Sequence, residues 1–126
     1  MTLTQARDFL RAELLAVAAV AVPGLDGVVA HDPGPVNPRA MSDGRGPATI
    51  CSITVETGDP AVVDPAGQVA AAAAALTSRG WETEIAPVEG GHHSLAARRD
   101  GYEVAVHGWD GDWRLTLAGE TPEITD

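Results

Sequence analysis

The chain has no lysine and only one cysteine, Cys51, among its 126 residues. A single cysteine allows no internal disulfide, which excludes the disulfide-stabilised secreted domains. Long apolar runs are missing too, because the run at residues 14–22 is far shorter than the roughly 20 residues that span a bilayer. Asp8 and Glu13 interrupt the stretch where a signal peptide would be basic, and no cysteine follows for lipid attachment. We therefore expect a cytoplasmic protein.

Basic residues are scarce as well. Eight arginines stand against 18 acidic residues, which gives a net charge of -10 at pH 7. Nucleic acids and anionic membranes both attract basic surfaces, so this balance argues against both as partners. The charge favours encounter with a basic partner protein, and it equally serves solubility. The hydrophobic content of 44% excludes a compositionally disordered chain, and the length suits a single domain, residues 1–126.

Two Asp-Gly pairs, Asp100-Gly101 and Asp110-Gly111, lie between alternating apolar and polar residues at positions 94–119. Asp-Gly readily adopts the two positive φ angles of a type I′ turn, so each pair predicts a two-residue hairpin loop. Together the two pairs predict a three-stranded antiparallel meander.

The predicted loops also set the register of the meander. The first hairpin should place Leu95 opposite Val106 and Arg98 opposite Glu103, a favourable cross-strand charge pair. The second hairpin should place Val106 opposite Leu115. One face of the meander is then apolar and needs a cover. It carries Leu95, Ala97, Tyr102, Val104, Val106, Trp113, Leu115 and Leu117.

Residues 81–89 predict a fourth strand before the meander, with Trp81 in the core. A two-residue Gly90-Gly91 loop would pair Ile85 with a residue of the polar face. A three-residue loop that includes His92 pairs Ile85 with Ala97 and keeps Ile85 on the apolar face, so the core pattern favours the longer loop. After Gly119 the acidic tail is expected to fray.

Two helices and one further strand precede these elements. A Thr2/Gln5 capping box begins a helix over residues 3–22, and Asp64 caps an alanine-rich helix over residues 65–79. Residues 48–57 alternate as a strand. Residues 24–47 are rich in glycine and proline and predict a long partner-facing loop, with a short strand conceivable at residues 28–30.

The expected fold is therefore α+β, in the order α-β-α-β-β-β-β. An antiparallel sheet of about five strands, including the C-terminal four-stranded meander, should be covered on one face by the two helices.

Trp109 is the main candidate for a binding residue. It lies on the polar face of the meander beside Asp110 and Asp112, with Glu103 on the same strand. An exposed tryptophan next to acidic residues is typical of a binding hot spot. The alternative is that its ring lies flat over the neighbouring alanines of the sheet.

His92, His107 and Asp112 form the alternative candidate, a metal or small-molecule site on the same face. Arg114 is expected directly opposite His107 and would repel a cation, and no HxxxH or cysteine ligand pair is present. We therefore expect no metal and no other cofactor.

A catalytic set is not recognisable in the sequence. Ser94 should lie opposite His107, but no acid is in register to orient this pair. Cys51 falls on the apolar side of its strand, without an activating base. No glycine-rich stretch has phosphate-binding spacing. Enzymatic activity is therefore not expected.

The segment from about residue 66 to 122 has a familiar pattern: a helix ending in LTSRGW, a strand, a glycine-rich turn, then SLAARRDGYEVAVHGWDG and LTLAGETP. It resembles a small actinobacterial α+β domain found mostly in uncharacterised lipoproteins and secreted proteins. This chain departs from that pattern in lacking the export signal and the lipid-attachment cysteine. The resemblance implies a fold and no catalytic residues.

These observations favour a non-enzymatic protein-binding module for a basic partner, such as an immunity protein or a secretion-linked adaptor. The alternative is a small-molecule or metal-binding domain, or a weak enzyme, that uses His92, His107 and Asp112. A homo-oligomer that associates through the face around Trp109 is a third hypothesis.

Overall fold

The computed structural model describes residues 2–25, 27–36 and 50–124. The described elements are α1 (Leu3–Ala21), β1 (Val28–His31), β2 (Pro35–Val36), β3 (Ile50–Gly58), α2 (Pro65–Ser78), β4 (Glu82–Ile85), β5 (His92–Arg99), β6 (Tyr102–Trp109) and β7 (Arg114–Glu120). Residues 37–47 of the predicted loop and residues 48–49 of the predicted strand lie outside the described part. The α+β class is confirmed, with β1 and β2 added to the predicted order.

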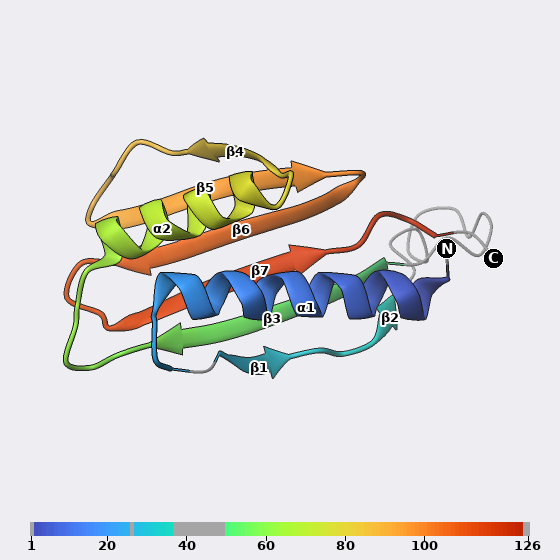
Figure 1. Ribbon diagram of the computed structural model, residues 1–126, viewed down its shortest axis with the longest axis horizontal. Coiled ribbons are helices and arrows are strands. Elements are labelled where there is room, and N and C mark those ends of the chain that lie inside the picture. Colours follow the sequence, from blue (N-terminus) through green and yellow to red (C-terminus); the bar gives the residue numbers. More distant parts are fainter. Residues whose placement is uncertain (1, 26, 37–49, 125–126) are drawn as a thin grey trace.

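Six strands form an open antiparallel sheet in the order β1-β3-β7-β6-β5-β4, and β2 pairs with β3. The two helices lie side by side on one face of this sheet (Figure 1). α1 packs on β3 and β7, whereas α2 packs on β4, β5 and β6. The opposite face, which we call the open face, is covered by no described element. Within the described residues, neither helix combines the length and apolar character that a membrane crossing requires.

Both predicted helix starts are confirmed. Thr2 Oγ1 accepts a hydrogen bond of 3.1 Å from Gln5 N, and Gln5 Oε1 accepts one of 2.8 Å from Thr2 N, which completes the capping box. Asp64 Oδ1 accepts a 3.1 Å bond from Gly67 N at the start of α2. These local bonds satisfy amides that would otherwise lack partners at the helix ends.

The core lies between the sheet and the two helices, and two glycines of the sheet let the helices approach closely. A Cβ at Gly119 of β7 would lie 2.8 Å from Leu10 Cδ1 of α1, and a Cβ at Gly108 of β6 would lie 3.0 Å from Pro65 Cβ at the start of α2. The fully buried leucines, Leu10, Leu14, Leu76, Leu95, Leu115 and Leu117, come from both layers.

The first hairpin folds as predicted. Asp100 and Gly101 have φ angles of +50° and +86°, the two positive values of a type I′ turn. The β5–β6 register therefore places Leu95 opposite Val106 and Arg98 opposite Glu103.

The second hairpin corrects the prediction. Among the described residues near this turn only Gly111 has a positive φ, +80°, so the turn is not type I′. Asp110 N donates to Gly91 O (2.8 Å), which prolongs the β5–β6 edge, and Asp112 Oδ1 accepts from Arg114 N (2.9 Å). With these bonds the turn is two residues longer than predicted. Val106 therefore lies opposite Leu117 rather than Leu115.

A shift of two residues leaves every β7 side chain on its predicted face, because side chains alternate with a period of two. Trp113 is the exception. It was expected in the core, but it precedes β7 and is 40% exposed.

The turn before β5 corrects a second register. Glu89 bridges to His92, so the loop is Gly90-Gly91 and not the predicted three residues. Ile85 nevertheless lies opposite Leu95, a residue of the apolar face. The segment from Ile85 to Glu89 has one residue more than the segment of β5 that lies opposite it, and this extra residue produces the shift. The sequence therefore predicted the face on which Ile85 lies, but not the structural cause.

The C-terminal tail is ordered farther than expected. Thr121 N donates to Cys51 O (2.9 Å) and Thr121 Oγ1 accepts from Cys51 N (2.9 Å). Ile124 is buried in the core. The prediction of fraying after Gly119 is therefore wrong for residues 120–124.

Candidate functional site

The open face presents its side chains in rows that run across the strands. A charged row and an alanine row lie next to each other, and the strand registers define both. The charged row is Glu82, Arg98, Glu103, Glu120 and Ser52, from β4 to β3. The alanine row is Glu84, Ala96, Ala105, Ala118 and Thr54.

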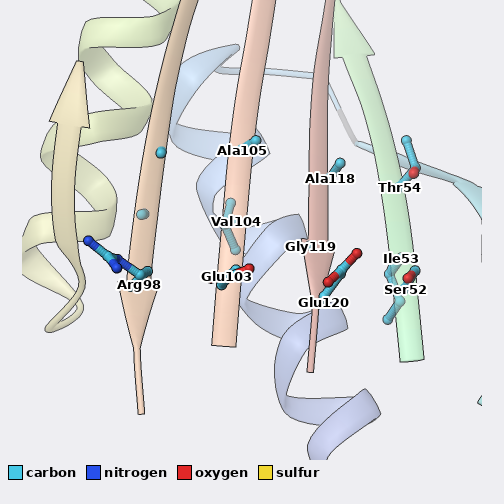
Figure 2. A pocket seen from close by; sticks show the side chains of 12 residues that line it. Ser52, Ile53, Thr54, Arg98, Glu103, Val104, Ala105, Ala118, Gly119 and Glu120 are labelled. Atoms are coloured by element: carbon cyan, nitrogen blue, oxygen red, sulfur yellow. The ribbon is translucent and has the colours of Figure 1, made fainter. Parts of the chain in front are cut away.

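The β5, β6, β7 and β3 members of these two rows line an open concavity of about 470 Å³ (Figure 2). Its floor is made by the small side chains of Ala96, Ala105 and Ala118, which leave the sheet backbone close to the surface. Arg98, Glu103 and Glu120 stand along one side of this floor. The arrangement combines an apolar floor with a charged rim, as binding surfaces do.

The charge of the rim is uneven. Glu103 and Glu120 lie directly opposite each other on β6 and β7. Figure 2 shows that Arg98 extends toward β4 and away from these two carboxylates. Among the described residues, no ion pair engages Glu103 or Glu120. The predicted Arg98–Glu103 register is therefore present without a salt bridge.

The open face as a whole is acidic. Within the described strands it carries five glutamates against two arginines, an excess of three negative charges with neutral histidines. The glutamates are Glu56, Glu82, Glu84, Glu103 and Glu120, and the arginines are Arg98 and Arg114.

A cluster of rings, His92, His107 and Trp109, lies on the same face, farther along the strands. His92 stacks on Trp109, with ring centroids 4.1 Å apart. His92 Nε2 lies 2.8 Å from His107 Nδ1, and the two imidazole planes are 9° apart. Burial and the nearby charge of His92 lower the pKa of His107. In this contact one ring nitrogen donates a hydrogen bond and the other accepts it.

Trp109 itself is 50% exposed on the open face, as predicted. Its ring contacts His92, which differs from the alternative in which the ring covers the alanines. Glu103 is on the same face but at the opposite end of β6, six residues away. The predicted binding residues thus mark two ends of one surface rather than one compact site.

The two predicted aspartates have local partners. Asp110 Oδ1 lies 2.7 Å from His93 Nε2, a side chain that the register places on the opposite face from His92. Asp112 binds the backbone N and the guanidinium of Arg114, and these hydrogen bonds lower the pKa of Asp112. The Asp112 carboxylate therefore stabilises the β6–β7 turn, and the Asp110 carboxylate joins this turn to β5.

The predicted metal set is brought together only in part. His92 and His107 are adjacent, but Asp112 is engaged by Arg114 and does not join them. Thr116, and not Arg114, lies opposite His107 because of the β6–β7 shift, so Arg114 is not in the position that the sequence predicted. Among the described residues, no group of three or more His, Cys, Asp or Glu is arranged to hold a metal ion.

The sequence interpretation missed Glu120, Ala118 and Ser52 as members of the site. Glu120 was assigned to a frayed tail, although the alternation of Leu115, Leu117 and Gly119 continues past it. Ser52 reaches the site because β3 pairs with β7, which places Ser52 opposite Glu120, a residue far along the chain. Only the alternation of β7 could have suggested Glu120.

Cys51, the lone cysteine, lies on the helix side of β3. It is fully buried, and burial raises the pKa of its thiol. A buried thiol with a raised pKa is a poor nucleophile. Cys51 therefore serves as a core residue.

No protein-family model matches this chain, and no curated protein or solved structure matches it either. The likeness of residues 66–122 to small actinobacterial domains remains a prediction from the sequence.

Proposed function

We propose that this chain is a protein-binding module and that the open face is its binding surface. The observation that carries the proposal is the concavity on an uncovered sheet, with its alanine floor and glutamate rim. Trp109 adds a half-exposed aromatic ring to the same face. Interface centres are enriched in such aromatic residues.

The size of the face suits this role. Six strands about 4.8 Å apart, with roughly seven residues each at about 3.4 Å per residue, give a face of roughly 600 Å². A standard interface buries about 800 Å² on each partner. One partner would therefore cover the whole open face and part of the surface around it.

The negative charge of the chain and of its open face determines which kind of partner protein we propose. The net charge of -10 and the acidic open face attract a protein with a basic surface and speed its encounter. An immunity protein that neutralises a basic toxin, or an adaptor for a basic secreted protein, has this chemistry. Proposed residues for the contact are Trp109 and Glu103, with the turn residues Asp110 and Asp112 at the edge.

Affinity capture with matched baits tests the proposal. The full chain, Glu103→Lys and Asp8→Lys are immobilised and exposed to lysate of the native host at low and moderate salt. Asp8 is an exposed residue of α1, on the other side of the molecule, and its variant carries the same charge change. We expect a basic protein to be retained by the wild type and by Asp8→Lys, and lost from Glu103→Lys.

Retention should weaken as the salt concentration rises, because the exposed charges are screened. Equal retention by all three baits would place the binding surface elsewhere. The recovery of no partner at either salt concentration would count against a binding function.

A further inference from the structure

Two negatively charged side chains lie directly opposite each other in the concavity. Glu103 and Glu120 face each other across β6 and β7, both are exposed, and neither takes part in an ion pair among the described residues. Like charges at directly opposed positions destabilise a sheet. The free chain therefore carries a repulsion that a cation between the two carboxylates would remove.

The floor beside these carboxylates is apolar. Ala105 lies two residues after Glu103 on β6, directly opposite Ala118 of β7, and both alanines line the concavity. A surface with an apolar floor and two carboxylates at its end matches a long basic side chain, which has an aliphatic stem and a charged head. Arginine fits better than lysine because its planar fork can bond both carboxylates at once.

We infer that the concavity receives an arginine side chain of the basic partner protein, with the guanidinium between Glu103 and Glu120. The stem of this arginine lies over Ala105 and Ala118. The inference rests on the binding function proposed above and specifies how that partner is recognised.

Charge decides against a second copy of this chain as the occupant. Two copies that meet through their open faces would bring two surfaces with an excess of negative charge together, on chains of net charge -10. Arg98, the one basic residue that lines the concavity, extends toward β4 and away from Glu103 and Glu120. The partner must supply the cation.

A peptide titration followed by NMR tests the inference. The probe is acetyl-Ala-Arg-Ala-amide, added to the isotope-labelled full chain, and the comparison peptide has citrulline, which keeps the shape but not the charge, in place of arginine. We expect the arginine peptide to shift the amide signals of residues 103–105 and 118–120 most strongly. The citrulline peptide should shift them little.

Matched variants make the test specific. Glu120→Gln should weaken the binding of the arginine peptide at least about fivefold, because one of the two carboxylates loses its charge. Asp8→Asn changes the net charge equally and should alter the affinity less than about twofold. The urea midpoint of Glu120→Gln should rise, since the like-charge contact is removed, which separates lost binding from a folding defect.

Several outcomes overturn the inference. One is a set of shifts spread over all acidic surfaces; another is equal binding of the citrulline peptide. A dimer in light scattering that dissociates on Glu120→Gln would assign the face to a second copy. A captured partner that is lost on Trp109→Ser but retained by Glu103→Gln and Glu120→Gln would refute the arginine contact and leave the proposed binding function standing.

Discussion

Trp81 Nε1 donates a hydrogen bond of 3.1 Å to Glu13 Oε1, so the start of the strand after α2 is joined to the middle of α1. Arg79 pairs with the same carboxylate, and Arg99 Nη1 lies 3.5 Å from it. The Glu13 side chain is only 5% exposed. One buried carboxylate therefore links both helices to β5, and its loss should loosen the whole helical layer.

Glu13→Gln is expected to lower the free energy of unfolding by about 2–4 kcal/mol, because breaking a buried ion pair leaves the partner charges without compensation. Urea unfolding measures this. The matched control is Glu84→Gln on the exposed side of β4, which should change stability by less than about 0.5 kcal/mol. Equal effects of the two substitutions would show that the Glu13 cluster is not stabilising.

Glu13 also predicts an acid dependence. Burial raises the pKa of its carboxyl, but the hydrogen bonds from Arg79 and Trp81 outweigh burial and leave the pKa lowered. Its contribution to stability is therefore present above the unfolded pKa and is lost as the pH falls through the folded pKa. In Glu13→Gln the acid side of the stability curve should be flatter.

Thr57 and Thr121 are buried to a similar extent, but replacing each with valine should have opposite effects on the stability of the fold. Thr57 is 6% exposed, and its Oγ1 has no hydrogen-bond partner among the described residues. Thr121 is 3% exposed, and its Oγ1 accepts from Cys51 N. Thr57→Val removes an unsatisfied hydroxyl and should stabilise the fold by about 1 kcal/mol, whereas Thr121→Val should destabilise it by about 1–3 kcal/mol.

Thermal or urea unfolding of the two valine variants checks this pair. Each serves as the control for the other, because the change in side-chain chemistry is identical. Destabilisation by Thr57→Val would mean that its hydroxyl has a partner after all.

The His92–His107 pair predicts a loss of stability on mild acidification. The pKa of His107 is lowered by burial and by the nearby charge of His92, so the unfolded chain binds a proton more readily than the folded chain does. The contribution of His107 to the free energy of unfolding is therefore complete above about pH 6.5, the usual pKa of histidine. This contribution declines as the pH falls from there toward the lowered pKa that His107 has in the folded chain.

Urea unfolding between about pH 8 and pH 5.5, combined with an NMR titration of the imidazole signals, tests this prediction. His107→Gln should reduce the decline, and His31→Gln, which changes an exposed histidine of β1, should leave it as it is. A folded-state pKa of His107 above its ordinary value would contradict the prediction.

Local signals in the sequence were sufficient for several elements. The Thr2/Gln5 capping box, the Asp64 N-cap and the Asp100-Gly101 turn each depend on residues a few positions apart, and each is present as predicted. The alternation of apolar residues also determined which face of β5, β6 and β7 is buried. Side chains of a strand point to alternate faces whatever lies beside it.

The β6–β7 and β4–β5 registers could not be predicted from such local signals. A shift of two residues between β6 and β7, or between β4 and β5, returns every side chain to the same face, so the apolar pattern is equally satisfied before and after the shift. Hydrogen bonds in the turns decided between these registers, notably the contact of Asp112 with Arg114. The exposure of Trp113 follows from that choice.

The sequence by itself determined the class of fold, the buried face of the meander and the acidic character of the chain, because composition, periodicity and capping are local properties. The tertiary structure alone decided that β3 lies beside β7, that Glu103 faces Glu120, and that three alanines share one concavity. These relationships join residues far apart along the chain, and they depend on which strands pair and in which register.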